Sequence, residues 1–273
     1  MRPFRVVTRK NWLADLFKPF GAVQDFGFDI DPDTAPETYW WAPGAWVASA
    51  SKTGVDLPLL SCGPYWLDRL PWCYTGRDIR TAALGDLPKE STRPLFVKLP
   101  EAKTDSCPAQ IYDTPQLAET WRGFGFPDNT LVQWQSVVEF VTEARFFIAD
   151  GAVAASSLYR HKDWMWGADD TPHLRSEMRT MDRFVGAVLN DQAVAYPPGF
   201  VLDVGITQSG EARVVEANAA WSSGPYDADP AGVVAAIKAS HDHRDVHRKW
   251  RWRDHADSVW AKAVPLKTSK TAH

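Results

Sequence analysis

Two strand-turn-strand patterns in the second half of the chain constrain its fold more than any other feature. Runs rich in β-branched and aromatic residues flank Asp150-Gly151, and similar runs flank Ser209-Gly210. Asp-Gly between two such runs is a strong signal for a tight β-hairpin turn, and Ser-Gly is also a common turn dipeptide. The sequence therefore predicts two β-hairpins, over residues 143–160 and 200–219.

Helix signals surround these hairpins. Between the hairpins, apolar residues recur with the spacing of one helix face at Met178, Met181, Phe184, Val185, Val188 and Leu189. After the second hairpin, Asp229-Pro230 supplies a helix cap followed by proline in the first turn. Upstream, residues 95–99 (LFVKL) indicate a short strand, and residues 113–125 indicate a helix after a polar loop. A further helix is expected near residues 64–70.

Oxygen-bearing side chains occupy matched positions in the second predicted hairpin. Glu216 and Asn218 are two residues apart in a strand and must project from the same face. Asp203 is about as far before the Ser209-Gly210 turn as Glu216 is after it, so the two carboxylates are expected to lie opposite each other. Two carboxylates and an amide oxygen then converge.

Carboxylates that face each other across a sheet repel unless a cation lies between them. Magnesium is the natural candidate, since it prefers hard oxygen ligands and completes its coordination with water and phosphate. An alternative interpretation stays open: Asp203 could begin a turn, Glu216 could be a solvated strand residue, and Asn218 could cap a loop.

Basic residues in the right places favour the metal interpretation. Lys98 ends the apolar strand LFVKL, and Lys103 follows in the next loop. Arg145 is two residues after Glu143 and therefore shares its strand face, and Arg160 ends the adjoining strand. Such side chains could hold the oxygens of a metal-bound triphosphate. A plain surface ion pair is the alternative for the glutamate and the arginines.

These blocks, in this order, resemble the ATP-grasp superfamily. VLDVGITQSGEARVVEANAAWSSGPYD is similar to its metal-binding hairpin and the substrate loop that follows. FVKLPEAKTDSCPA resembles its strand lysine and phosphate-covering loop, and WQSVVEFVTEARFFIADGAVAASSLYR resembles its adenine hinge and the following strands. Within the superfamily, EARFFIADG and SSLYR look closest to the clade named for two arginines and a lysine, here Arg145, Arg160 and Lys98.

The resemblance implies ATP held between two α+β lobes, and phosphoryl transfer to a carboxylate that an amine then attacks. It assigns each predicted site residue a role. Lys98, Lys103, Gln135, Val137, Val138 and Glu143 would bind the nucleotide, with 135–138 as the hinge and Glu143 on the ribose. Arg145 and Arg160 would neutralise charge on the transferred phosphoryl group, and Asp203, Glu216 and Asn218 would hold Mg²⁺.

The loop after the hairpin, residues 221–227, would line the acceptor pocket with Trp221, Ser222, Ser223 and Tyr226. One feature departs from the family pattern. The predicted phosphate loop carries Ala102, Ser106 and Ala109 as its small residues, where many members carry glycines. Its backbone contacts to phosphate are therefore uncertain from sequence.

Composition and the positions of glycine and proline breaks set the expectations for fold class, domain boundaries and localisation. The predicted fold class is a mixed α+β and α/β ATP-grasp fold preceded by a small α/β domain. The expected boundaries are 1–88 for the N-terminal domain, 89–240 for the ATP-grasp domain and 241–273 for a charged and aromatic extension. A net charge of -4, only three cysteines and no long apolar segment predict a cytoplasmic protein that does not act at a membrane. The small N-terminal domain suggests a small-molecule or peptide substrate.

Two other functional readings stay open from the sequence. Residues 248–253 alternate basic residues and tryptophans, which suits either a nucleic-acid surface or an edge strand with inward tryptophans. A nucleic-acid-binding or scaffold protein on an inactive ATP-grasp frame is therefore one alternative, and an ATP-grasp kinase is another. His241, His243 and His247 match no zinc spacing, so a charged, solvated helix is favoured there.

Overall fold

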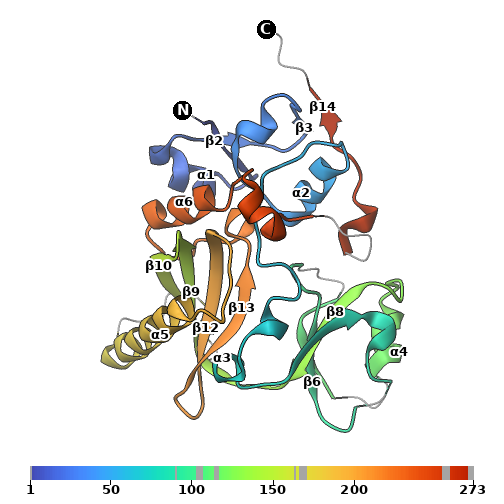
Figure 1. The fold of residues 1–273 in the computed structure, drawn as a ribbon, viewed down its shortest axis with the longest axis vertical. Coiled ribbons are helices and arrows are strands. Elements are labelled where there is room, and N and C mark those ends of the chain that lie inside the picture. Colours follow the sequence, from blue (N-terminus) through green and yellow to red (C-terminus); the bar gives the residue numbers. More distant parts are fainter. Residues whose placement is uncertain are drawn as a thin grey trace. The chain divides into compact units, whose positions relative to one another are not determined.

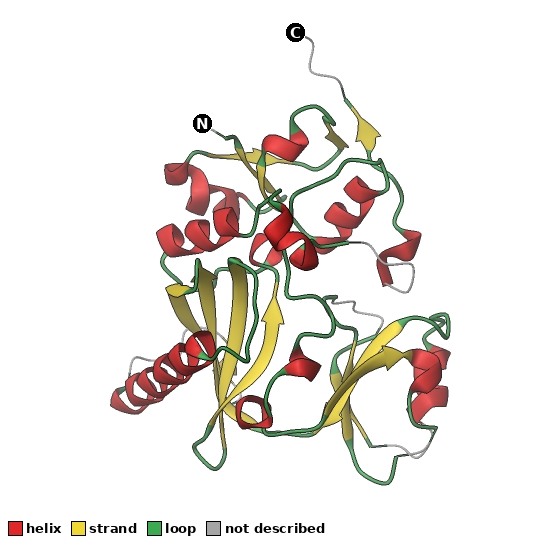
Figure 2. Cartoon of the chain, viewed as in Figure 1, coloured by secondary structure: helices red, strands yellow, loops and turns green. Residues whose placement is uncertain are grey.

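The computed structural model describes residues 2–89, 91–102, 107–113, 117–162, 164–165, 171–253 and 259–269. Contacts divide the chain into two compact units. Unit 1 comprises Met1–Cys62, Phe140–Arg253 and Ala263–His273, and unit 2 comprises Gly63–Glu139 and Asp254–Lys262. Helices and strands are mixed in both units (Figure 2). The expected domain boundaries after residues 88 and 240 stay a prediction.

Unit 1 begins with a small parallel sheet. Its strands lie in the order β2 (Ala22–Asp25), β1 (Phe4–Val7) and β4 (Tyr39–Trp41). Helix α1 (Asn11–Phe17) connects β1 to β2, and α2 (Gly44–Ser51) follows β4. Near the chain's end, β14 (Lys267–Thr268) pairs in parallel with β3 (Asp29–Ile30). The predicted α/β character of the N-terminal region is confirmed.

The larger sheet of unit 1 contains both predicted hairpins. Its order is β11 (Trp164–Met165), β10 (Ala152–His161), β9 (Phe140–Ala149), β12 (Gly199–Thr207) and β13 (Ala212–Asn218), with antiparallel pairing throughout. Asp150 and Gly151 turn with φ of 50° and 82°, the left-handed conformations that a type I′ turn requires. The strands β9 and β12 are neighbours although α5 separates them in sequence.

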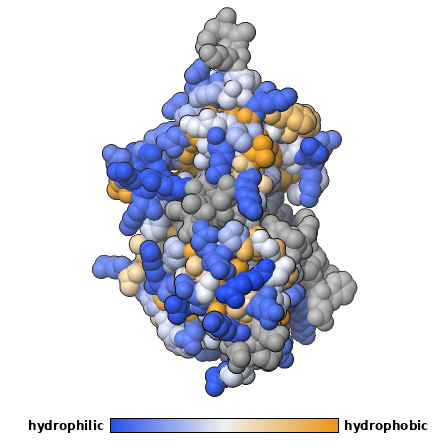
Figure 3. Space-filling view, turned by 90° about the vertical axis from the view of Figure 1, so that its right-hand side faces the viewer, coloured by the Kyte–Doolittle hydropathy of each residue, from blue (hydrophilic) through white to orange (hydrophobic). Residues whose placement is uncertain are grey.

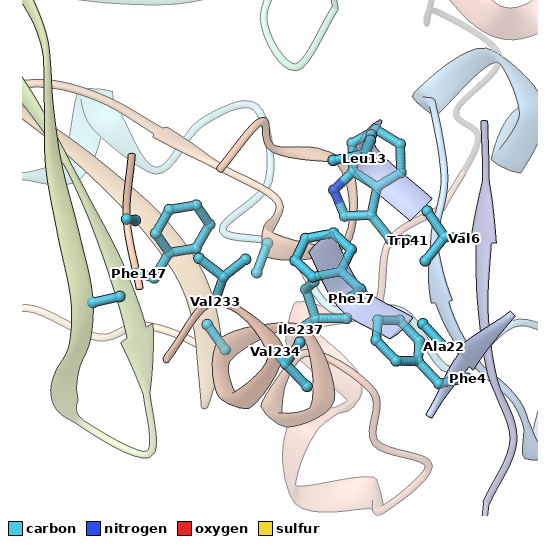
Figure 4. Close-up of a cluster of buried hydrophobic side chains, with 14 of the residues drawn as sticks. Phe4, Val6, Leu13, Phe17, Ala22, Trp41, Phe147, Val233, Val234 and Ile237 are labelled. Atoms are coloured by element: carbon cyan, nitrogen blue, oxygen red, sulfur yellow. The ribbon is translucent and has the colours of Figure 1, made fainter. Parts of the chain in front are cut away.

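Two helices cover opposite faces of this sheet (Figure 1). Helix α5 (Pro172–Asn190) carries Glu177, which accepts a hydrogen bond from Thr142 of β9. Helix α6 (Pro230–Ala239) is capped by Asp229, as predicted, and packs on Phe147 of β9, whose side chain alternates to the other face. Figure 4 shows apolar side chains of α6 between Phe147 and the residues of α1 and β1. The core of unit 1 therefore joins its two sheets through α6.

Unit 2 contains an antiparallel sheet in the order β5 (Ile79–Ala83), β8 (Leu131–Ser136), β6 (Leu95–Lys98) and β7 (Gln110–Tyr112). Its helices are α3 (Trp72–Thr75) and α4 (Leu117–Gly123). Alternate strand residues such as Val132 and Trp134 pack with Trp121 of α4 in one apolar cluster. The opposite face carries polar side chains at Gln133 and Gln135. The predicted strand 95–99 and the helix after it are confirmed.

Two local predictions were wrong, and one open alternative is excluded. The helix expected at residues 64–70 is a 3-10 turn over Leu67–Arg69, because Pro71 prevents continuation. Residues 248–253 do not form an edge strand: a 3-10 helix, Asp245–Trp250, is followed by a single bridge from Arg251 to Leu60. His241, expected on a solvated helix, is buried.

Hydrophilic residues cover most of the face drawn in Figure 3, with hydrophobic ones interspersed. Phe26 and Phe28 are exposed and stack on each other, with ring centroids 6.4 Å apart. Within the described ranges, no helix combines the length and hydrophobicity needed to cross a membrane.

Candidate functional site

The hairpin of β12 and β13 has the predicted register. Asp203 pairs with Glu216, and Val201 pairs with Asn218. A β-bulge directly beyond the Asp203–Glu216 pair shifts the register toward the turn. Asp203 is completely buried in the middle of the sheet, whereas Glu216 and Asn218 are half-buried on its outer strand. The two carboxylates therefore face each other across the hairpin, as their sequence positions require.

Asn218 lies between these two carboxylates. Its Nδ2 donates to Asp203 Oδ2 at 3.0 Å and to Glu216 Oε1 at 2.9 Å. An amide N–H pair shared by two carboxylates offsets part of their mutual repulsion. The three predicted metal ligands are thus brought together by direct hydrogen bonds.

Arg145 approaches the same carboxylate from the other side, because β9 places it opposite Asp203. Its Nε donates to Asp203 Oδ1 at 2.9 Å and its Nη2 donates to Oδ2 at 2.7 Å, while Nη1 donates to the carbonyl of Gly224 at 3.1 Å. The two side chains are 6% and 1% exposed. Burial acts to lower the pKa of Arg145, but the charge and hydrogen bonds of Asp203 outweigh it and raise that pKa.

A second acidic group lies two residues along β9. Glu143 is buried and accepts hydrogen bonds from Tyr159 Oη and Arg160 Nη1 of β10. Adjacent strand residues normally point to opposite faces, but a bulge leaves Tyr159 unpaired between Leu158 and Arg160. This bulge lets both side chains reach one carboxylate. Glu143 therefore holds Arg160, and Arg145, two residues farther along β9, holds Asp203.

The loop after β13 contributes Tyr226 to this cluster. Its ring stacks on Tyr159 with centroids 5.0 Å apart and an interplanar angle of 12°, and Arg145 Cζ lies 4.9 Å from its centroid. Burial, then the net effect of neighbouring charges, raises the pKa of Tyr159 well above its ordinary value, so its phenol stays protonated. Tyr226 also has φ of 50°, a strained left-handed conformation for an aromatic residue.

The other predicted acceptor residues lie elsewhere. Trp221 is a core residue whose Nε1 donates to the carbonyl of Leu60. Ser223 is buried and donates to the carbonyl of Ala219, and Ser222 is half-buried in the same 3-10 turn. Of these four side chains, Tyr226 is the one whose ring stacks on Tyr159 and lies against Arg145.

The predicted nucleotide residues outside the hairpins belong to unit 2. Lys98 ends β6 opposite Gln133, and Gln135 near the end of β8 is buried and accepts a hydrogen bond from Arg77 Nε. Val137 and Val138 lie in the loop between β8 and β9. Lys103, predicted to contact the nucleotide, lies outside the described residues.

Several residues of these networks were missed in the sequence. They are Tyr159, whose bulge position depends on strand register, and Arg77, Asp68, Thr81 and Gln133 of unit 2. The only sequence signal for Tyr159 is its place beside Arg160. For the unit 2 residues the partners are far apart, as with Arg77 and Gln135, so no local pattern indicates them.

The hairpin residues fit a hard divalent cation by their donor chemistry. Asp203, Glu216 and Asn218 offer only oxygen donors, once the Asn218 amide turns its oxygen toward the cation. Within the described ranges there is no cluster of three or more His, Cys, Asp or Glu side chains suited to a metal ion. The predicted set has two carboxylates and an amide, which suits Mg²⁺ better than zinc.

A family model decides the classification. The model for the ATP-grasp domain, R2K clade family 2, matches residues 74–236, more than half of the chain. This chain belongs to the ATP-grasp superfamily. Both the superfamily and the clade inferred from Arg145, Arg160 and Lys98 are therefore confirmed, as is the predicted fold class with its N-terminal parallel sheet and antiparallel sheets.

Solved structures similar to this ATP-grasp chain are distant in sequence. A RimK domain ATP-grasp protein from Sphaerobacter thermophilus DSM 20745 shares 14% identity, with 86% of this chain and 98% of that chain covered and a TM-score of 0.47. D-alanine–D-alanine ligase from Bacillus anthracis shares 14% identity, with 80% of this chain and 86% of that chain covered and a TM-score of 0.48. D-cycloserine synthetase DcsG shares 15% identity, with 86% of this chain and 97% of that chain covered and a TM-score of 0.48. No curated protein gives a significant match.

Proposed function

We propose that this ATP-grasp protein is an ATP- and magnesium-dependent ligase. It would phosphorylate a substrate carboxylate and join the acyl phosphate to an amine, forming an amide-type bond. The single observation that carries the proposal is the hydrogen-bonded set of Asp203, Glu216 and Asn218, with Arg145 against its buried carboxylate. A protein that kept this frame for packing alone would have no need to concentrate two carboxylates there.

In this proposal, the β12–β13 hairpin holds Mg²⁺ through Asp203, Glu216 and Asn218. The ion would supply charge neutralisation on the β- and γ-phosphates of ATP. Asn218 would turn its amide so that the oxygen replaces the N–H groups now shared by the carboxylates. Arg145 fixes the orientation of Asp203 through two parallel hydrogen bonds.

Arg145 and Arg160 are the proposed catalytic cations. Both guanidinium groups are anchored by carboxylates of the same sheet, Asp203 and Glu143. The Arg160 side chain is 42% exposed and can turn toward a transferred phosphoryl group. Arg145 would act through its Nη1 group, which donates to the carbonyl of Gly224 in this structure. Glu143 would bind the ribose hydroxyls, since each carboxylate oxygen has two lone pairs.

The remaining binding roles follow the predicted assignments. Lys98 and Lys103 would contact phosphates or the base, and the segment 135–138, with Gln135, Val137 and Val138, would form the adenine hinge. Loop 221–227 would face the acceptor with Ser222, Ser223 and Tyr226, while the buried Trp221 would hold the loop in place. The substrates would be a small-molecule or peptide carboxylate and an amine.

A product search tests the ligase proposal. The protein would be incubated with ATP, Mg²⁺ and pooled amino acids and metabolites, and ADP release and new masses would be followed together. We expect ADP with a condensed product, both reduced by at least about a hundredfold in Glu216→Gln. Glu211→Gln is the matched control, because Glu211 lies in the same hairpin and is exposed in a surface pair with Arg213.

The other outcomes separate the alternatives. A phosphorylated product that accumulates without an added amine would indicate a kinase. Unchanged ADP release in Glu216→Gln would contradict the metal assignment. Salt-dependent oligonucleotide binding with no nucleotide turnover would indicate the nucleic-acid-binding alternative.

A further inference from the structure

Unit 2 contains a row of polar side chains on adjacent strands, and its two buried members have no role in the proposed function. Thr81 of β5, Gln133 of β8 and Lys98 of β6 are successive cross-strand neighbours, and Thr81 and Gln133 are 7% and 2% exposed. Strand alternation puts Gln133 and Gln135 on one face and Trp134 on the other, where α4 packs. The row therefore lies on the sheet face that also carries the proposed hinge residue Gln135.

Asp68 fixes the hydroxyl group of this row. It accepts hydrogen bonds from the backbone N–H of Thr81 and, at 2.7 Å, from Thr81 Oγ1. An ionised carboxylate can only accept, so the single hydroxyl proton of Thr81 points to Asp68. Thr81 Oγ1 then has only lone pairs left to offer. A neighbouring group must donate to it.

That donor is the amide nitrogen of Gln133, whose Nε2 lies 2.9 Å from Thr81 Oγ1 and 3.5 Å from Asp68 Oδ1. The amide of Gln133 is therefore locked with its N–H groups toward Asp68 and Thr81. Its oxygen lies on the other side of the amide group and can only accept. Reversing the amide would place its oxygen against acceptor atoms.

This locked oxygen is the unusual feature. Gln133 Oε1 is buried and meets no hydrogen-bond donor among the described residues. Buried acceptors are almost always paired, so an orphaned one indicates a donor supplied from elsewhere. Gln135, two residues along the strand, differs because its Oε1 accepts from Arg77 Nε. Of these two amides, only Gln133 has a buried oxygen without a donor.

We propose that Gln133 is a specificity-determining residue that accepts a hydrogen bond from the exocyclic 6-amino group of adenine. The inference rests on the proposed function, which places the base at the neighbouring hinge. A phosphate oxygen cannot pair with Gln133 Oε1, because both are acceptors. A 6-oxo base such as hypoxanthine or guanine is rejected for the same reason, and Asp68 and Thr81 prevent the amide from turning to accommodate it.

Three nucleotides test this directly: ATP, inosine triphosphate, which has a 6-oxo group, and purine riboside triphosphate, which has no 6-substituent. Their affinities for the full chain with Mg²⁺ would be measured by calorimetry. We expect the parent to prefer ATP over inosine triphosphate by about a hundredfold or more, and over purine riboside triphosphate by about tenfold.

The variants separate two properties of Gln133: its acceptor oxygen, and the hydrogen bonds that fix the orientation of its amide. Gln133→Met removes the acceptor at similar size and should bring the three affinities within about threefold of one another. Thr81→Val removes the lock, so the amide can turn and the preference for ATP over inosine triphosphate should fall by at least about tenfold. Thr130→Val is the matched control, since Thr130 is a buried threonine directly before β8. It should keep the parent's preferences.

Each contrary result has a distinct meaning. An unchanged nucleotide preference in folded Gln133→Met overturns the role of Gln133. If Gln133→Met does not fold, an unchanged preference in Thr81→Val does the same. In either case, ATP binding by the parent leaves the proposed function standing. An equal loss for all three nucleotides also overturns the role of Gln133, because Gln133 would then serve Lys98 or the fold. A folded parent that binds none of them contradicts the proposed function itself.

Discussion

The sheets of the two units both carry buried polar groups, but each sheet stabilises its buried polar groups in a different way. In unit 1, β9 and β12 hold opposite full charges in contact, as Arg145 and Asp203 show. In unit 2, β5 and β8 hold mostly neutral groups whose hydrogen bonds fix orientation, as Thr81 and Gln133 show. The first arrangement keeps charge available beside the proposed cation site. The second fixes the direction of one acceptor.

The difference teaches that burial alone does not define a functional polar group. Charges in the unit 1 cluster are compensated within the sheet, so removing one leaves its partner uncompensated. Thr81 and Gln133 of the unit 2 row are neutral dipoles, so removing one loses a hydrogen bond and the direction that it imposed. The first should therefore show large effects on stability, and the second smaller effects on stability with larger effects on discrimination.

The largest stability effect is expected from breaking the Arg145–Asp203 pair. Arg145→Met should lower the free energy of unfolding by about 3–5 kcal/mol, because Asp203 would remain buried and uncompensated. Urea denaturation measures this change. The double variant Arg145→Met with Asp203→Leu should recover much of the loss. A single-variant loss below about 1 kcal/mol would contradict the charge-compensated description.

Arg77 provides the matched change in unit 2. Its guanidinium donates to Gln135 Oε1 and to the carbonyl of Thr75, which are neutral acceptors. Arg77→Met should cost about 1.5–3 kcal/mol in the same urea experiment. If Arg77→Met costs more than Arg145→Met, the contrast between the two sheets fails.

His241 extends the comparison to a buried titratable group held neutral. Its Nε2 accepts from the backbone N–H of Trp40 at 2.9 Å and its Nδ1 donates to the carbonyl of Ile237 at 2.8 Å. Burial lowers the pKa of His241 from 6.5 to about 3, although its hydrogen bond to the carbonyl of Ile237 acts in the opposite direction. The folded protein therefore keeps His241 uncharged at neutral and mildly acidic pH.

The sign of the pH effect follows from this lowered pKa. Below pH 6.5 the unfolded state binds a proton that the folded state does not, so stability is complete above that pH and falls as the pH drops toward 3. The expected slope is about 1.4 kcal/mol per pH unit, or about 2 kcal/mol lost by pH 5. His241→Gln should flatten the profile relative to the parent, and His243→Gln should not. Parallel parent and His241→Gln profiles would refute this assignment.

The smallest effect is expected at an exposed pair. Arg122 and Asp128 of unit 2 form a surface salt bridge at 3.1 Å, with side chains 39% and 73% exposed. Asp128→Asn should change the free energy of unfolding by less than about 0.5 kcal/mol, since water screens both charges. A loss comparable to that of Arg77→Met would show that exposure is a poor guide to these energies.

The sequence predicted the parts of the site that depend on local geometry. Strand alternation and turn position placed Asp203, Glu216 and Asn218 together, and the hairpin at Asp150-Gly151 brought Arg160 near Glu143. The two hairpins did not reveal that β9 and β12 are neighbours, so the Arg145–Asp203 pair was not foreseen. Sheet order between non-consecutive strands depends on packing that no local pattern records.

The unit 2 row was missed for the same reason. Asp68 lies in a 3-10 turn 13 residues before Thr81 and 65 before Gln133. The prediction for the region after residue 240 was wrong for a different reason. Its charges and histidines suggested a solvated segment, yet His241 packs into the core and Trp252 packs beside Trp221 with centroids 5.9 Å apart. Tertiary contacts there override the local polarity.

Binding of ATP to the parent and to Glu216→Gln, by calorimetry with Mg²⁺ and again with a chelator, tests the central claim most directly. Glu216 is half-buried, so its amide variant should fold. The account predicts Mg²⁺-dependent binding that weakens by at least about tenfold in Glu216→Gln and is unchanged in Glu211→Gln. Equal ATP affinity in the parent and Glu216→Gln, with or without Mg²⁺, would contradict a metal–nucleotide site at the β12–β13 hairpin.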